Sequence, residues 1–150
     1  MSVTISITGQ KEIDNVLRMM PRELSHAVLG AAHLAAAKPL IEKEKLLAPE
    51  GPTGNLVDSI GGVKMSAKRT DNIGEVRVGP RRGGRHKGFH GLFVNDGTKR
   101  RQTKTGANRG VMPAEPFAQP AFEQTKNTVE KGIAANIGKQ VIRVMKKYTG

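Results

Sequence analysis

Two histidines and one aspartate near the middle of the chain are the residues whose types suggest metal chemistry. His86 and His90 are four residues apart, a spacing that places two imidazoles on one face of a helix, and Asp96 follows closely. The residues between the histidines are part of a glycine-rich stretch with no helical pattern, and no third ligand is evident at the spacing of a zinc site. The sequence therefore predicts no metal site and no cofactor.

Other patterns of catalytic residues are also missing. Residues 83–88 are glycine-rich but lack the Gly-Lys-Ser/Thr ending of a phosphate-binding loop. The chain has no cysteine, and no local arrangement of Ser, His and Asp resembles a nucleophile with its base. With 13 acidic residues in 150, paired carboxylates for acid–base catalysis are hard to assemble. We therefore expect a protein that is not an enzyme.

Positive charge is concentrated in one region, residues 80–112. This region holds nine basic residues against one acidic residue, Asp96. Its two glycine-rich arms flank a short apolar core, Leu92–Val94, which is a candidate for an additional strand. Connections this long without their own structure are uncommon in compact domains and are usually functional. We predict an extended basic loop region that contacts a partner outside the subunit, through Arg81, Arg82, Arg85, Lys87, Lys99, Arg100, Arg101, Lys104 and Arg109.

Length and composition predict a single domain, residues 1–150. No apolar stretch approaches the roughly 18–20 residues of a membrane helix, and the first ten residues do not resemble a signal peptide, so we expect a cytoplasmic protein without a membrane partner. The calculated pI of about 10.4 raises nucleic acid as a partner. Aromatic residues make up only 3%, which favours phosphate contacts to a duplex over base stacking.

Hydrophobic periodicity predicts the elements of the first half. Alternating β-branched residues indicate a strand over residues 3–8, and a short helix is expected over residues 11–20. A long helix follows Pro21, with small alanines that allow close packing and a kink at Pro39. After the kink, Leu40, Ile41, Leu46 and Leu47 are expected to continue its apolar face.

The second half begins with a short turn of helix capped by Thr53 or Asn55, followed by a two-stranded hairpin over residues 63–68 and 75–79. The last helix is predicted from an apolar stripe at helical spacing that starts at Phe122. Its basic C-terminal end suits the helix dipole. His26 and His33 are expected on a helix flank.

Three short motifs in order resemble one family. They are Ala48-Pro49 with Thr53-Gly54-Asn55-Leu56 and Ser59-Ile60, then Phe93-Val94-Asn95-Asp96-Gly97-Thr98, then Pro113-Ala114-Glu115-Pro116-Phe117 with Pro120-Ala121. With an early helix and a C-terminal helix, they are similar to the small tail-component, or tail-completion, proteins of tailed bacteriophages. The resemblance spans nearly the whole chain, and the basic arms depart from it.

The resemblance implies an α+β fold in which a small antiparallel β-sheet packs against a long N-terminal helix and a C-terminal helix, with long basic loops. It also implies a structural protein of the virion neck or tail, assembled in the host cytoplasm. Identical subunits would form a homo-oligomeric ring, six-fold or a multiple of six, between the head connector and the tail terminator or tail tube.

Two roles remain open for the motifs and the arms. The motif residues are candidates for subunit or partner contacts, although Pro113–Phe117 also fits an ordinary helix entry with Phe117 in the core, and Gly97-Thr98 fits a turn. The arms fit a protein neighbour, duplex DNA in the channel, the alternative function of sequence-independent nucleic-acid binding, or a solvated charge run that is flexible until assembly. The candidate interface residues are Leu92, Phe93, Asp96, Gly97, Thr98, Pro113, Glu115, Pro116 and Phe117.

Overall fold

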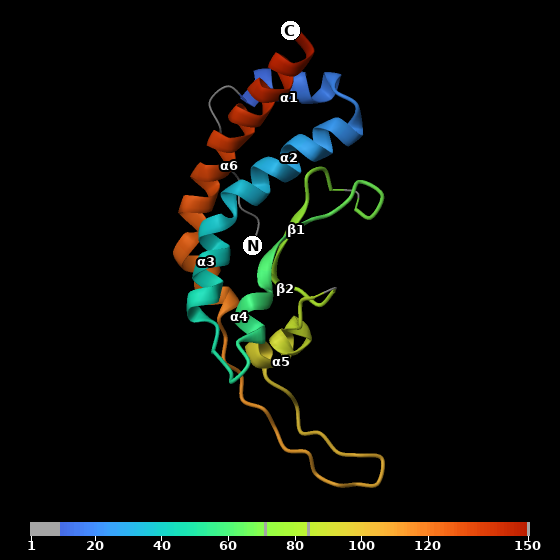
Figure 1. Ribbon diagram of the computed structural model, residues 1–150, viewed down its shortest axis with the longest axis vertical. Helices are drawn as coiled ribbons and strands as arrows, with labels where there is room; N and C mark the ends of the chain where they lie inside the picture. The colour runs from blue at the N-terminus through green and yellow to red at the C-terminus, as the bar shows by residue number, and fades with distance from the viewer. Residues whose placement is uncertain (1–9, 71, 84, 150) are drawn as a thin grey trace. The chain divides into compact units, whose positions relative to one another are not determined.

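The computed structural model describes residues 10–70, 72–83 and 85–149, which form two compact units (Figure 1). The helical unit contains Met1–Pro39, Gly62–Arg77 and Lys126–Gly150. The arm unit contains Leu40–Gly61 and Val78–Thr125. Because the chain passes back and forth between the units, they are not successive domains along the sequence, and the single domain expected from chain length stays a prediction.

The fold is α+β, as the sequence predicted. The described residues contain six α-helices, one 3-10 helix and one two-stranded sheet of β1 (Ile60–Lys64) and β2 (Val76–Pro80). The strands are antiparallel, because Met65 N–H donates to the Glu75 carbonyl (2.9 Å) at one end of the pair and Arg81 N–H donates to the Ser59 carbonyl (3.0 Å) at the other. The predicted hairpin is therefore confirmed, but its first strand covers residues 60–64 in place of the predicted 63–68, and Val63, expected in the core, is 44% exposed. The predicted strand over residues 3–8 lies outside the described residues.

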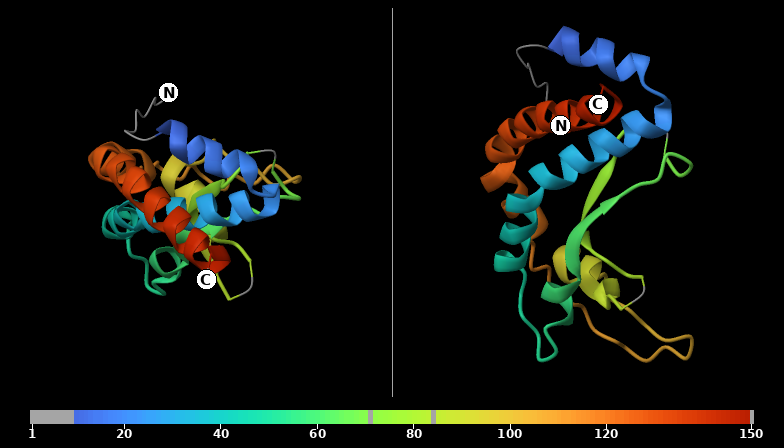
Figure 2. Two further views of the ribbon diagram at one scale, coloured as in Figure 1. Left: turned by 90° about the horizontal axis from the view of Figure 1, so that it is seen from above. Right: turned by 45° about the horizontal axis from the view of Figure 1, so that its top comes forward.

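Three helices build the helical unit: α1 (Gln10–Met19), α2 (Arg22–Ala36) and the part of α6 (Ala118–Thr149) that follows residue 125. In Figures 1 and 2, α2 lies beside α6. Their shared core consists of Val28 and Ala32 from α2 and Ile137 and Val141 from α6. Small residues allow the helices to approach closely, since Ala32 is fully buried and a Cβ placed on Gly132 would lie 3.4 Å from the Ala36 Cβ. This confirms the close packing predicted from the alanines of α2.

Two histidines on α2 hold the tip of the β1–β2 hairpin. The backbone N–H of Gly74 donates to His26 Nδ1 (3.1 Å), which leaves the Nε2–H of the neutral ring to donate to the Met65 carbonyl (2.5 Å). The Gly74 carbonyl accepts from His33 Nδ1 (2.7 Å). Both polar groups of one peptide residue are thus satisfied by side chains of a single helix, which gives the two histidines a defined structural role on the flank predicted for them.

The arm unit is built from short elements. They are α3 (Lys38–Leu47), α4 (Asn55–Ser59), the 3-10 helix η1 (Gly88–His90), α5 (Gly91–Asp96) and the start of α6. The kink predicted at Pro39 appears as a break at Ala37, with Pro39 in the first turn of α3, where its missing N–H leaves no intrahelical bond unmade. Within the described residues no single helix is long and apolar enough to cross a membrane. Only the bent pair Leu24–Ala36 and Lys38–Leu47, taken together, has the length and composition of a membrane span.

Several local predictions for the arm unit were wrong. Leu92–Val94 is helical, because it belongs to α5, and the basic region 80–112 therefore contains a folded core. Neither Thr53 nor Asn55 occupies the N-cap of α4, since Gly54 (φ +62°) stands there and Asn55 is the first helical residue, but Thr53 Oγ1 accepts from Asn55 N–H (3.5 Å). The prediction that Leu46 continues the apolar face of α3 was also wrong, because Leu46 is 74% exposed.

Candidate functional site

The three motifs singled out in the sequence meet in one buried cluster of the arm unit. Ala48, Leu56 and Ile60 come from the first motif, Val94 from the second and Phe117 from the third. Ile60 and Phe117 are almost completely inaccessible, at 0% and 1% exposed. Residues separated by up to 69 positions in the chain are therefore brought into contact, and the motifs specify the core of this unit.

Asn95 joins the second motif to the third. Its Oδ1 accepts from the backbone N–H groups of Phe117 (3.0 Å) and Ala118 (3.1 Å), at the beginning of α6. The first N–H groups of a helix have no partner within the helix, so Asn95 acts as a cap supplied from a distant segment. A third bond between the two motifs, from Glu115 N–H to the Val94 carbonyl (2.9 Å), joins the neighbouring residues. Sequence reasoning included Asn95 in a motif but missed this role.

The candidate interface residues differ in how far they are buried. Phe117 lies in the core, as expected if Pro113–Phe117 is an ordinary helix entry rather than an interface. Leu92 (51%) and Phe93 (48%) are the large exposed apolar members. Gly97 has a structural reason to be glycine, because its φ is +70° and a Cβ there would lie 2.9 Å from the backbone of Met112 and Ala114. Of the remaining candidates, Thr98 is partly buried and its Oγ1 accepts from Met112 N–H, while the others are exposed: Asp96, Pro113, Glu115 and Pro116.

Phe89, Leu92 and Phe93 form an exposed apolar stripe along η1 and α5. Their spacing of three and four residues places them on one helical face, and Phe89 is 65% exposed. The opposite face is buried through Gly88, Gly91 and Val94. Clusters of exposed large apolar side chains commonly mark interaction sites in proteins. We call these three residues the apolar stripe.

The first of the two basic arms is a closed loop. Arg81 N–H and Nε both donate to the Ser59 carbonyl (3.0 and 2.9 Å), and the Arg81 carbonyl accepts from Gly88 N–H (3.0 Å). Gly88 cannot carry a side chain here, since a Cβ would lie 2.3 Å from Ser59 Oγ. Arg81 is thus held by the fold. The remaining basic residues of this loop are exposed: Arg82, Arg85 and Lys87.

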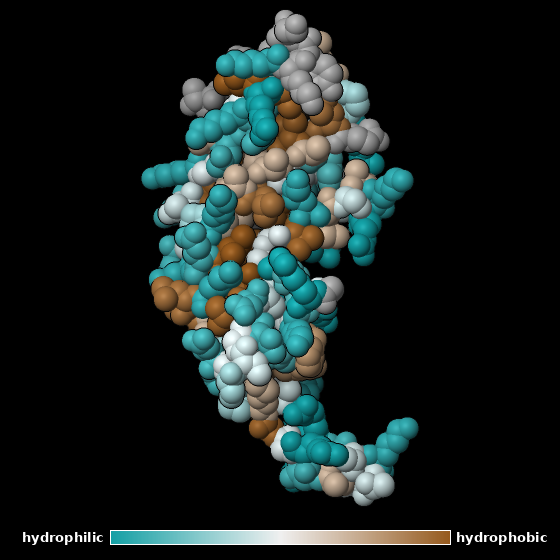
Figure 3. All heavy atoms as spheres, viewed as in Figure 1, coloured by the Kyte–Doolittle hydropathy of each residue, from teal (hydrophilic) through white to brown (hydrophobic). Residues whose placement is uncertain are grey.

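The second basic arm, residues 97–112, is a hairpin with its own backbone hydrogen bonds. Thr98 N–H donates to the Met112 carbonyl (2.9 Å), and Arg101 and Arg109 are joined to the opposite side through 3.1 and 2.7 Å bonds. We call this segment the basic hairpin. The views in Figures 1 and 2 agree that it projects away from α4 and α5, and Figure 3 shows that hydrophilic side chains dominate its surface. Its five basic residues are exposed: Lys99, Arg100, Arg101, Lys104 and Arg109.

His86, His90 and Asp96 are not arranged as a metal site. His90 lies in η1, whereas His86 is not in a helix, so the four-residue spacing does not place both rings on one helix face. The part of the chain that the structure describes contains no group of three His, Cys, Asp or Glu side chains able to hold a metal ion. Desolvation, together with the nearby charges of Arg81 and Arg85, lowers the pKa of His86 below its ordinary value.

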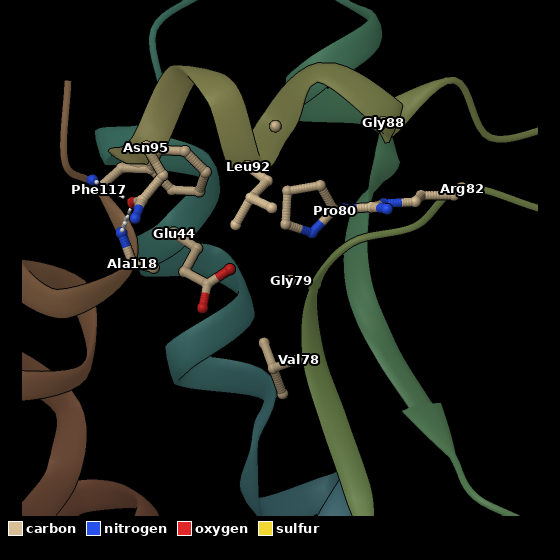
Figure 4. Close-up of a pocket in the computed structure, with 11 residues that line it drawn as sticks. Glu44, Val78, Gly79, Pro80, Arg82, Gly88, Leu92, Asn95, Phe117 and Ala118 are labelled. Carbon is tan, nitrogen blue, oxygen red and sulfur yellow. Dashed lines mark hydrogen bonds between the residues drawn. The ribbon is translucent and has the colours of Figure 1, made fainter. Parts of the chain in front are cut away.

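A cavity of about 180 Å³ in the arm unit contains a buried carboxylate that the sequence analysis did not single out (Figure 4). Glu44 on α3 is 4% exposed, and its Oε2 has no hydrogen-bond partner among the described residues. Burial raises the pKa of Glu44 to about 7. Figure 4 shows the carboxylate directed into the space between Leu92 and Gly79.

The position of Glu44 follows from helical periodicity in α3. Ile41, Glu44 and Ala48 are spaced by three and four residues, and all three are turned toward the core of the arm unit, whereas Leu46 is turned toward solvent. The signal was present in the sequence, but an acidic residue at a core position is read as polar surface by any pattern based on hydrophobicity.

Comparisons of the chain with models of protein families, with curated proteins and with solved structures found no match.

Proposed function

We propose that the protein is a structural subunit of the neck or tail of a tailed bacteriophage, and that its copies form a ring joining the head connector to the tail. The observation that carries this proposal is the meeting of the three family-like motifs in one core, tied together by Asn95. A chance resemblance of short motifs gives no reason for them to pack against one another. Motifs that build one core are expected where the resemblance reflects a common fold.

The surface features of the arm unit suit assembly. Closed rings form when one surface of a subunit binds a different surface of the next copy. The apolar stripe offers buried area at such a contact, and the basic hairpin offers charge that steers and orients association. Because the hairpin has its own backbone hydrogen bonds, less conformational entropy is lost when it docks.

The test of assembly compares two pairs of apolar-to-polar substitutions in the full chain. Leu92→Ser with Phe93→Ser removes most of the apolar stripe, while Met19→Ser with Ile142→Ser alters two exposed residues of the helical unit that are 86% and 55% exposed. Sedimentation velocity should show ring-sized particles for the wild type and the control pair, and smaller species for the stripe pair. A wild-type chain that stays monomeric at all concentrations would contradict the proposal.

Head–tail joining gives the functional readout. Particles assembled without this chain should contain full heads and separate tails, and addition of the purified wild-type protein should join them. Normal joining in its absence, observed by electron microscopy, would sink the proposed function. The stripe pair should fail to restore joining and the control pair should succeed.

Sequence-independent binding of duplex DNA is the second candidate function. It is favoured by the exposed basic hairpin, whose five cations have no acidic partner in the described part of the chain. Their exposure suits phosphate contacts, and the scarcity of aromatics near them argues against single-stranded DNA.

A further inference from the structure

The cavity at Glu44 has the composition of a binding site for a cation with an apolar stem. Its walls include Val78, Pro80, Leu92 and Phe117, which are apolar, and Glu44 contributes a carboxylate. An isolated carboxylate is costly to bury because it loses its hydration, and an uncompensated one is retained only at a cost in stability. A cation placed in the cavity would supply the missing partner.

Two ligand classes fit poorly. A metal ion needs several oxygen or nitrogen ligands, and among the described residues Glu44 is the only acidic side chain lining the cavity. Asn95 Oδ1 is already engaged by the two N–H groups of α6. An anion is disfavoured by the carboxylate itself. An ammonium or guanidinium group remains, with its methylene stem against the apolar walls.

Arg82 is the other charged residue lining the cavity, and it does not neutralise Glu44 in the structure. It forms no ion pair within the described residues and its side chain is exposed. Arg81 is likewise engaged elsewhere, through the Ser59 carbonyl. The carboxylate is therefore left for a cation that comes from outside this copy of the arm unit.

We propose that the Glu44 cavity receives a lysine or arginine side chain from the basic hairpin of a second copy of this chain. Charge complementarity selects this occupant: one copy offers a buried acid whose Oε2 has no partner among the described residues, and another offers five exposed cations on a projecting hairpin. Leu92 lines the cavity and also belongs to the apolar stripe, so one contact would engage both features. The inference rests on the proposed ring, in which each copy uses its hairpin toward one neighbour and its cavity toward the other.

Mixing two complementary variants of the full chain tests this contact. The cavity variant is Glu44→Gln, which keeps the shape of the side chain and removes its charge. The hairpin variant replaces Lys99, Arg100, Arg101, Lys104 and Arg109 with Gln. Each variant alone should associate about tenfold or more weakly than the wild type, as expected for the loss of a charged hydrogen bond. The mixture should form pairs with wild-type affinity, since the hairpin of one variant meets the intact cavity of the other.

Controls separate this inference from the proposed function. Lys139→Gln, at an exposed cation of α6 outside the arm unit, should associate like the wild type, and circular dichroism should show that every variant is folded. If Glu44→Gln associates like the wild type while the stripe pair does not, the cavity contact is overturned and the ring stands. If the wild type never associates, both are overturned. If mixing does not restore association, the second-copy contact is overturned.

A small cation tests the cavity itself. Titration of n-butylguanidinium into the hairpin variant should shift the carboxyl carbon resonance of Glu44 in NMR spectra, and the same titration should compete with pairing in the mixture. Binding of this probe without any competition would identify the cavity as a site for free cationic molecules and would overturn the second-copy contact. Absence of binding to the hairpin variant would overturn the cation site.

Discussion

At the scale of single residues, Glu44 makes stability depend on pH. Its pKa is raised to about 7 by burial in the fold, above the value of 4.5 that it has in an unfolded chain. As pH rises through this window the unfolded chain releases its proton first, so the folded state loses stability between these two values.

Glu44→Gln should remove this loss. The free energy of unfolding in urea should match that of the wild type near pH 4.5 and exceed it by about 1–2 kcal/mol near pH 8, a figure discounted because the cavity opens to solvent. The comparison belongs at low protein concentration, where self-association is negligible. Equal stability of the two proteins near pH 8 would show that the carboxylate finds a partner in solution.

Gly74 is a second residue whose identity is dictated by its surroundings. Its φ is +72°, and a Cβ would lie 2.4 Å from the Cβ of Leu29. Gly74→Ala should therefore destabilise the chain by roughly 2–3 kcal/mol, since it combines left-handed strain with overpacking. Thermal unfolding checks this, with Gly51→Ala as the control because nothing lies within 4 Å of a Cβ there. Similar melting temperatures for the two variants would contradict the close packing of Gly74 against α2 at the hairpin tip.

At the scale of elements, the beginning of α6 depends on Asn95. Asn95→Ala should cost about 1–2 kcal/mol of unfolding free energy, because two N–H groups of the helix lose their acceptor. Asn108→Ala is a matched control, since its Oδ1 accepts only from Gly110 N–H within the exposed basic hairpin. Urea denaturation measures both. If the loss of unfolding free energy in Asn95→Ala is no larger than in Asn108→Ala, the Asn95 cap does not stabilise the fold.

The long helices were predictable from the sequence, and so was the short helix α4, but α5 was not. α1, α2 and α6 carry periodic patterns over many residues, so local spacing alone indicates them, whereas the alternation at residues 63–68 placed the first strand of the β1–β2 hairpin too late in the chain. α5 has six residues, and its helical form depends on contacts that no local pattern reveals. Gly91 allows Pro80 to approach, with a Cβ there only 2.5 Å from the proline ring, and Val94 enters the core.

The candidate site was predictable in part for the same reason. Exposed basic residues are visible in the sequence, and the motif residues were found, but which of them face inward depends on the tertiary fold. Phe117 is in the core, while Leu92 and Phe93 are about half exposed. Arg81 looked like its neighbours in the basic run, yet its guanidinium is held against Ser59 by the fold. The Glu44 cavity needed segments from α3, β2 and α5 to come together.

At the scale of the whole molecule, net charge decides how the chain meets nucleic acid. The formal charge of +12 predicts binding to mixed-sequence duplex DNA that weakens steeply with salt. If the basic hairpin carries this binding, replacement of its five cations with Gln should flatten the slope of log affinity against log salt by about four to five. Fluorescence anisotropy across a salt series measures the slope. An unchanged slope would place the phosphate contacts elsewhere and leave the hairpin to protein neighbours.

The basic hairpin is also separable from the core that carries it. The hydrogen bonds between Asn95 and α6 and between Glu115 and Val94 join the two ends of the basic hairpin at its base. A Cβ at Gly106, near the hairpin tip, would meet nothing within 4 Å. A fluorescent protein inserted at this tip would therefore leave the fold intact while blocking docking sterically. The same chain thus provides a site at which assembly can be watched, or arrested, without unfolding the subunit.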